Sequence, residues 1–521
     1  MKERRTIRSA SRGKLLRSVC VALCCLLTMT GCTGRQQGEQ KQVLTLPPAR
    51  SSYEAPRTDR PIGGDRLYAL YLPGNNGLSL AAQHVSLGPG TSQEIAEALV
   101  QNLLNHEGMQ VLGADTRLSL FGDHPVELSG GVCTVNLGSS ALQLSYRNFY
   151  TVALALAATL CELDNISSVN VLVADQSVGL DVAGGLAMGG IMAHPGESLP
   201  VLWEQMEAKR TPVGWDMSQT PLNSLVTLYF PLEDGNGVLC ETRNITFEGQ
   251  TPQQLASGIL KELSNGSLRL TGVPVMPDLA ALMLHEPLTS ELADGGRLVT
   301  LSFREDAPAF LQQEGIDLSC LMAAMVLSLT TFIPGTAAVS IRVGEQPVTQ
   351  LTSEQFGQVS ALGGLMRRST AEIFLRGLTT VYFEKDGLLV SCEKTVNREE
   401  ADSPRAQLAA LIEGPDGQDL LRGILATLPE TVSEGDILGI AEAGGTLLVN
   451  LSENFRAEIQ AQGPEREMLL CYSMVNTLCG NTGLRRVCFF FEDEQVEQIA
   501  GEIYWAGEFD WNTGLVEPSF G

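Results

Sequence analysis

The sequence predicts an α+β protein of three tandem small domains, each a mixed β-sheet with two helices packed on one face. A unit of apolar helix, short turn and buried strand, clearest from Ser473 to Glu494, occurs three times. In each copy a hydroxyl residue directly precedes a leucine, that leucine lies nine or ten residues before a strand valine, and an acid follows the valine by six. Such internal repetition predicts repeated domains. The hydroxyl residues are Thr159, Ser328 and Thr477, the valines are Val169, Val339 and Val487, and the acids are Asp175, Glu345 and Asp493.

The beginning of each copy shows the same repeat. An opening strand carries a tyrosine, and a hydroxyl residue that can cap a helix follows 20–22 residues later. Thr91 with Glu94 and Thr251 with Gln254 form capping boxes. Apolar residues at helical spacing follow each cap, so each copy is expected to run strand, strand, helix, strand, helix, strand. The tyrosines are Tyr71, Tyr229 and Tyr382, and the caps are Thr91, Thr251 and Ser403.

Glycine and proline separate the copies and set the expected boundaries. The first linker holds Trp203 and Trp215, which could pack domains together or form a glycan-stacking surface. The second linker holds the basic pair Arg367-Arg368, and a short helix is expected from Ser353. We predict domains at residues 66–177, 223–346 and 378–521, the last with a C-terminal tail, and linkers at 178–222 and 347–377.

Residues 1–32 have the pattern of an export signal. Seven Lys and Arg precede an apolar run, Val19 to Met29, that is too short to span a bilayer as a mature helix. The segment Leu27 to Cys32 resembles a bacterial lipobox, in which the cysteine receives a diacylglycerol group. We therefore predict lipidation at Cys32, and the alternative is an ordinary secretory signal with a chance cysteine. Residues 33–65, rich in Gln, Arg, Ser and Pro, are predicted to be a flexible tether.

Composition limits the partners. Without residues 1–31, which hold seven of the 35 basic and one of the 60 acidic side chains, 28 basic and 59 acidic side chains remain, a formal charge of −31. Such a surface disfavours nucleic acid and anionic lipid headgroups. The eight cysteines after Cys32 lie in apolar patterns and are expected to be buried free thiols, although export also permits disulfides. Five scattered histidines do not suggest a zinc site.

No catalytic motif stands out. The chain has no G-x-S-x-G, P-loop, strand-linked G-x-G-x-x-G or H-E-x-x-H pattern. We therefore predict no catalytic residue, no cofactor and no metal ligand, and expect the protein not to be an enzyme. Acids are numerous enough to leave a paired-carboxylate glycosidase open on counts alone. The strand-end acids Asp175, Glu345 and Asp493 are interpreted as solvated turn residues rather than a cation site.

The motifs of the third copy resemble a known family. The order of a strand ending in Tyr-Phe, a capped helix ending at Leu411 to Pro415, a strand from Leu447 to Ser452 and a helix segment from Val475 to Leu478 resembles the GerM domain, named for a sporulation and spore germination lipoprotein. The resemblance covers roughly residues 66–510 apart from the linkers. The first two copies depart from it at the end of the capped helix, and Ser328 replaces the threonine of the helix motif in the second.

The resemblance implies an exported, lipid-anchored protein on the outer face of the cytoplasmic membrane of a Gram-positive-type bacterium, with a fold similar to ring-building modules. We therefore expect a non-enzymatic assembly or interaction module of the cell envelope, with a role in sporulation or germination and with envelope or spore-assembly proteins as partners. The first alternative is a peptidoglycan- or glycan-binding lipoprotein. The second is an envelope enzyme or a transporter's substrate-binding lipoprotein.

Overall fold

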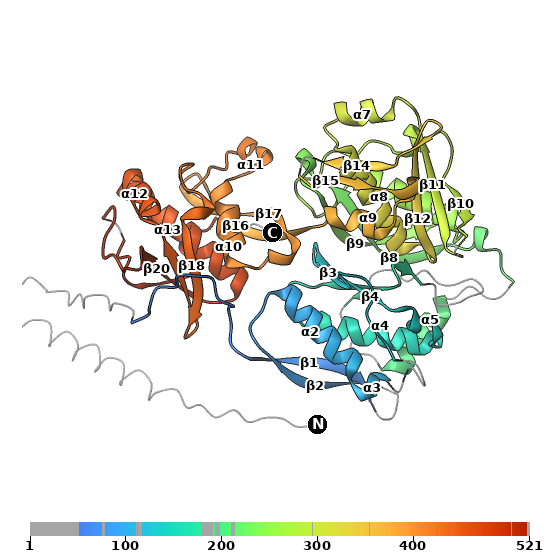
Figure 1. Ribbon diagram of the computed structural model, residues 1–521, viewed down its shortest axis with the longest axis horizontal. Helices are drawn as coiled ribbons and strands as arrows, with labels where there is room; N and C mark the ends of the chain where they lie inside the picture. Colours follow the sequence, from blue (N-terminus) through green and yellow to red (C-terminus); the bar gives the residue numbers. More distant parts are fainter. Residues whose placement is uncertain are drawn as a thin grey trace, which may run out of the picture. The chain divides into compact units, whose positions relative to one another are not determined.

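The computed structural model confirms the predicted fold class, since the same order of strands and helices occurs three times along the chain (Figure 1). The predicted signal, the lipidation site Cys32 and the first part of the tether lie outside the described residues. The structure describes residues 52–74, 79–110, 112, 117–178, 191–192, 198–209, 214–293, 295–353, 355–501 and 503–517.

The first unit opens with an antiparallel hairpin, β1 and β2, followed by a helix capped by Thr91 in the predicted capping box. Its mixed sheet has the order β3-β4-β5-β6, and the parallel pair β4/β5 is connected by the apolar helix α4. The elements are β1 (Arg66–Pro73), β2 (Leu80–Leu87), α2 (Ser92–Asn105), α3 (Glu107–Gln110), β3 (Val126–Ser129), β4 (Val132–Leu137), α4 (Tyr146–Leu160), β5 (Ser168–Val173), β6 (Gln176–Ser177), β7 (Ile191–Met192) and α5 (Leu199–Lys209).

The second unit repeats this order and shares one continuous hydrophobic core with the first. Its central helix α8 has 13 of 15 residues buried, because the hairpin and the mixed sheet both pack against it. The elements are β8 (Leu222–Pro231), β9 (Val238–Phe247), α6 (Pro252–Ser264), β10 (Leu288–Glu291), β11 (Arg297–Phe303), α7 (Ala307–Gln313), α8 (Leu318–Phe332), β12 (Thr336–Val343), β13 (Gln346–Pro347), β14 (Gln350–Ser353), β15 (Gly357–Ser360) and α9 (Arg368–Ala371).

The third unit has its own core, which includes Trp505 and Phe509 from the C-terminal tail. The tail strand β21 pairs with β20, and the Trp505 indole N–H donates to the buried carboxylate of Glu467 at 2.8 Å. The elements are β16 (Arg376–Lys385), β17 (Leu388–Asn397), α10 (Pro404–Glu413), α11 (Gly417–Leu421), β18 (Ile437–Ala443), β19 (Thr446–Leu451), α12 (Glu453–Gln462), α13 (Pro464–Thr482), β20 (Arg486–Phe491) and β21 (Glu508–Asp510).

The structure differs from the sequence predictions at three places. In each unit the opening hairpin is a separate two-stranded sheet, so the strands do not all belong to one sheet. The helix expected from Ser353 is wrong: its hydroxyl accepts from the Gln355 and Phe356 N–H groups, but Gly357, at φ 71°, turns the chain back into the β14/β15 hairpin. The described end of the tether is not a free spacer, because it docks on the third unit.

Among the described helices, one bent pair has the length and composition of a membrane span. No single described helix is long and apolar enough to cross a membrane. Helices α7 and α8 together reach the length and composition of a span, with a bend of 108° between them.

Candidate functional site

The aligned tyrosines and hydroxyl residues of the three copies meet in the structure. The backbone N–H of Tyr71 donates to Thr159 Oγ1 at 3.0 Å, that of Tyr229 to Ser328 Oγ at 3.0 Å, and that of Tyr382 to Thr477 Oγ1 at 3.1 Å. Each bond joins the opening strand to the central helix. Ser328 keeps the hydroxyl that the bond requires, so the departure of the second copy from the family motif does not remove this function.

Of the three strand-end acids, Asp175 and Asp493 are turn residues held by a neighbouring strand, and Glu345 lies in a turn that Gly344, at φ 59°, makes instead. Asp175 and Asp493 have φ of 66° and 69°, and the residue before each also has positive φ, as in the tight turns that connect antiparallel strands. In the first unit Asn136 Nδ2 donates to Asp175 Oδ1 at 2.6 Å, and the Asp175 N–H donates to Asn136 Oδ1 at 3.0 Å. Asn450 and Asp493 repeat both bonds at 2.8 and 3.1 Å. These acids therefore stabilise a turn.

The two linker tryptophans differ in their surroundings. Trp203 lies on α5, packs against the Leu154 cluster and donates from its indole N–H to Thr151 Oγ1 on α4 at 3.3 Å. Trp215 is 64% exposed. Trp203 therefore packs the linker helix on the first unit and does not join two domains as expected, and of the two linker tryptophans Trp215 is the one exposed for stacking.

A buried ionic cluster joins the repeated units. Glu127 on β3 of the first unit is 4% exposed and accepts from Arg368 of the second linker at 2.5 Å and from Arg398, after β17 of the third unit, at 2.9 Å. The Arg368 guanidinium also donates to Thr331 Oγ1 at 2.7 Å and lies 5.9 Å from the Tyr229 ring centroid, both in the second unit. One carboxylate of the first unit thus binds arginines from the second linker and the third unit. We call Glu127, Arg368 and Arg398 the ionic joint.

The electrostatics of the ionic joint are strongly perturbed. Burial would raise the pKa of Glu127, but the positive charges of Arg368 and Arg398 outweigh burial and hold it below the ordinary value. Burial raises the pKa of nearby Glu372 to about 7, and the negative charge of Glu127 acts in the same direction. Perturbed carboxyl groups can mark catalytic sites. Here the ionised carboxylate is enclosed by its own arginines, so the arrangement fits a structural joint.

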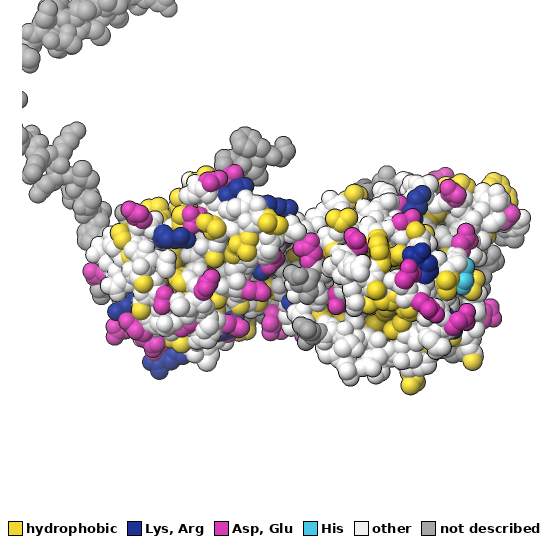
Figure 2. Space-filling view, turned by 90° about the horizontal axis from the view of Figure 1, so that it is seen from above, with side chains coloured by type: hydrophobic (Ala, Val, Ile, Leu, Met, Phe, Trp, Pro, Cys, Tyr) yellow, Lys and Arg dark blue, Asp and Glu magenta, His cyan; other side chains and the backbone are white. Residues whose placement is uncertain are grey.

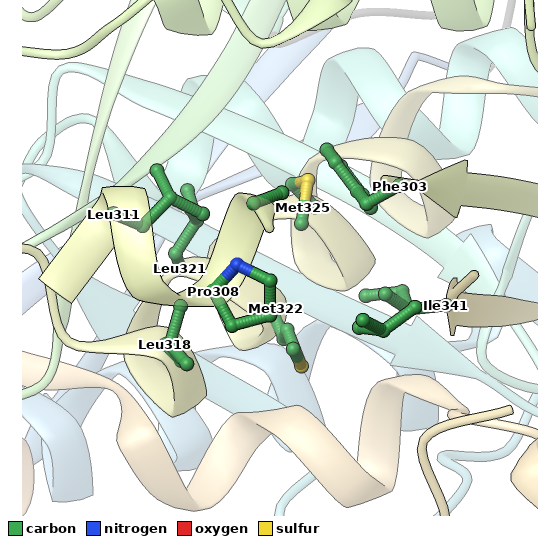
Figure 3. Close-up of a pocket in the computed structure, with 10 residues that line it drawn as sticks. Phe303, Pro308, Leu311, Leu318, Leu321, Met322, Met325 and Ile341 are labelled. Carbon is green, nitrogen blue, oxygen red and sulfur yellow. The ribbon is translucent and has the colours of Figure 1, made fainter. Parts of the chain in front are cut away.

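Two cavities differ in size and in lining. The first, in the second unit, lies between α7, α8 and the sheet and is lined by apolar side chains, among them Phe303, Leu311 and Met325 (Figure 3). Its volume of about 20 Å³ is roughly that of one water and far below the ~300 Å³ of small-molecule pockets. The second, of about 630 Å³, lies beside the end of the tether, and three arginines and five acids line it: Arg60, Arg66, Arg405, Asp59, Glu94, Glu162, Asp164 and Asp402. The excess of acids disfavours an anionic ligand, and the pairing of Asp59 with Arg405 neutralises part of the lining.

The described part of the chain shows neither a cluster of metal ligands nor a reactive thiol. Among these residues no group of three or more His, Cys, Asp and Glu could hold a metal ion. The eight cysteines after Cys32 are free thiols, and all but the half-buried Cys161 are buried. Burial raises the pKa of the Cys240 thiol to about 12, which keeps it protonated and unreactive at neutral pH.

The end of the tether lies along the third unit, beside β18 (Figure 1). We call residues 53–62 the strap. Asp59 accepts from the Ile440 N–H at 2.9 Å and pairs with Arg405 at 2.5 Å. The predicted flexible tether is therefore wrong for these residues. The polar composition of the strap gave no indication of its contacts with the third unit, such as that of Asp59 with Arg405, more than 340 residues away in the sequence.

The comparisons agree with the predicted family resemblance. Residues 380–497 match the family model Germane, described as sporulation and spore germination. No curated protein is significantly similar to the chain. Three solved structures are similar: the tandem GerMN domains of the sporulation protein GerM from Bacillus subtilis (17% identity, TM-score 0.21, 58% of this chain and 99% of that one), the first GerMN domain of the same protein (18%, 0.19, 24% and 89%), and a candidate lipoprotein from Clostridium perfringens (16%, 0.18, 26% and 87%). At these identities and TM-scores no functional argument rests on the structures.

Proposed function

We propose that this chain, which carries a GerM-family domain at residues 380–497, is a lipid-anchored, non-enzymatic assembly module of the bacterial cell envelope that acts in sporulation or spore germination. The anchor would be a diacylglycerol group on Cys32, at the outer face of the cytoplasmic membrane of a Gram-positive-type cell. Its partners would be envelope or spore-assembly proteins.

One observation carries the proposal: the residues that define the repeat serve the fold. The hydroxyl of Thr477 holds the opening strand, and Asn450 with Asp493 holds a turn. The ionic joint then fastens the repeated units to each other. The polar residues that recur in the three copies thus stabilise the fold and do not form a catalytic arrangement. This supports a role in which the outer surface of the protein binds other proteins.

The charge of the surface supports proteins as partners. Acidic side chains are spread over the face seen in Figure 2, in keeping with the formal charge of −31 without the leader. Such a surface repels nucleic acid and steers basic partner surfaces toward the chain.

One exposed aromatic residue favours the second candidate function, peptidoglycan or glycan binding. Trp215 is 64% exposed and could stack on a sugar ring. Binding by one ring would be weak, so this function ranks second.

The test uses the chain from residue 33 onward, incubated with purified peptidoglycan sacculi and, separately, with detergent-solubilised envelope proteins. We expect no sedimentation with sacculi and saturable capture of a defined envelope protein. Sedimentation that Trp215→Ala abolishes would replace the proposal with the glycan-binding function. Release of soluble wall fragments would contradict the non-enzymatic assignment.

A further inference from the structure

The strap covers an apolar face of the third unit's sheet. Alternate side chains of a strand point to opposite faces, so Leu448, Cys488 and Phe490 point away from the main core and form a cluster of their own. Tyr53 and Ala55 of the strap pack on this cluster, which is at most 4% exposed. Without the strap this face would be an apolar patch on the surface.

Polar contacts fix the strap in register. The Pro56 carbonyl accepts from Asn450 Nδ2 at 3.0 Å, and Arg57 pairs with Asp493 at 2.8 Å. The Arg60 N–H donates to the Ile440 carbonyl at 2.8 Å, which satisfies a backbone group of the edge strand β18. The turn acid Asp493 thus also has a role in binding the strap.

A glycine makes room for the strap. A Cβ on Gly439 would lie 2.6 Å from the Pro56 carbonyl oxygen and 2.7 Å from the Thr58 nitrogen. The φ of Gly439 is not in the left-handed region, so its backbone conformation does not require glycine. The close approach of the strap backbone is what requires glycine at this position.

The same face of the first unit is also a docking face. There the residues equivalent to Leu448 and Cys488 are the polar Thr134 and Asn170, and Asn170 Oδ1 accepts from Thr227 of the second unit's hairpin at 3.0 Å. In the first unit a folded hairpin occupies the face. In the third unit the occupant is a peptide.

We propose that the third unit's sheet face also accepts the strap of a second copy, so that copies join by exchanging straps; this rests on the proposed assembly function. The strap makes the same contacts with the sheet face whether it comes from the same chain or from another copy. Exchange therefore changes only the path of the residues that link the strap to β1. The Gly63 N–H still donates to the Glu442 carboxylate on β18, so the connection between the strap's contacts and β1 is Gly64 and Asp65. Copies anchored in one membrane would also be at high local concentration.

Two complementary variants of the chain from residue 33 onward test the exchange. The first variant, the acceptor, lacks residues 53–62, so its sheet face is open and it has no strap of its own. The second variant, the donor, carries Gly439→Val, which blocks its own sheet face and leaves its strap unbound. We expect each to be monomeric and their equimolar mixture to form a one-to-one complex of twice the mass by light scattering. Gly417→Val, at a position where a Cβ meets nothing within 4 Å, should behave as the unmodified chain.

Each other outcome contradicts part of the proposal. If the acceptor binds a synthetic peptide of residues 52–63 but the mixture stays monomeric, the strap acts only within its own chain and exchange is excluded. If neither the peptide nor the donor binds, the face is not a docking site. Phe490→Glu serves as a second donor in case Gly439→Val unfolds. The sacculus and capture experiments use the unmodified chain, so they can fail independently of this one.

Discussion

Replacing Glu127 by leucine is expected to cost roughly 3–5 kcal/mol of stability, because removing one partner of a buried ion pair leaves its counter-charge desolvated and unpaired. Arg368 is 2% exposed and Arg398 10%, so both would lose their shared carboxylate without gaining water. The loss should appear first at the ionic joint. Hydrogen exchange of peptides containing β3, α9 and the end of β17 measures it.

A surface pair serves as the control. Arg304 and Asp306 lie 3.2 Å apart with 45% and 71% of their side chains exposed, so Arg304→Leu should cost less than ~1 kcal/mol. A triple variant with Glu127→Leu, Arg368→Met and Arg398→Met should recover part of the loss, because neither arginine remains buried without a partner and the neighbouring Glu372, whose pKa burial raises to about 7, can take up a proton. Equal effects of Glu127→Leu and Arg304→Leu would show that the ionic joint contributes little to stability.

Replacing Thr477 by valine should destabilise the third unit by about 1–3 kcal/mol, because the buried Tyr382 N–H loses its acceptor while the side-chain shape is kept. The expected result is faster hydrogen exchange in the segments of β16 and α13. Thr477→Ser should cost less, since the second unit makes the same bond with Ser328. If serine and valine destabilise equally, the lost contact is packing, and the hydroxyl has no special role in the repeat.

The repeated helices and strands are predictable from the sequence because their signals are local. Caps such as Thr91 and Thr251 and apolar periodicity each involve a few neighbouring residues, and the structure contains both capping boxes. The alignment of the copies marks Thr477 and Tyr382 as repeated positions, whereas their contact appears only in the structure. The separation of the opening hairpins from the mixed sheets could not be predicted, because the sequence pattern of a strand does not indicate which strand it pairs with.

The ionic joint and the strap depend on contacts that no local pattern encodes. Glu127 meets Arg368 and Arg398 across 241 and 271 residues, and the only sequence signal was the basic pair in the second linker. The strap is rich in proline and charge, which predicts a disordered spacer. Its order comes from a sheet face supplied by the other end of the chain. Tertiary partners therefore decide its conformation.

The measurement that tests the central proposal most directly is the membrane association of the full chain in a Gram-positive host. We expect the unmodified chain to incorporate labelled palmitate and to enter the detergent phase on phase partition. Cys32→Ser should abolish both, whereas Cys25→Ser, a change in the leader, should leave both intact. If Cys32→Ser still takes up lipid and partitions with the membrane, Cys32 is not the anchor and the proposed lipid-anchored module is wrong.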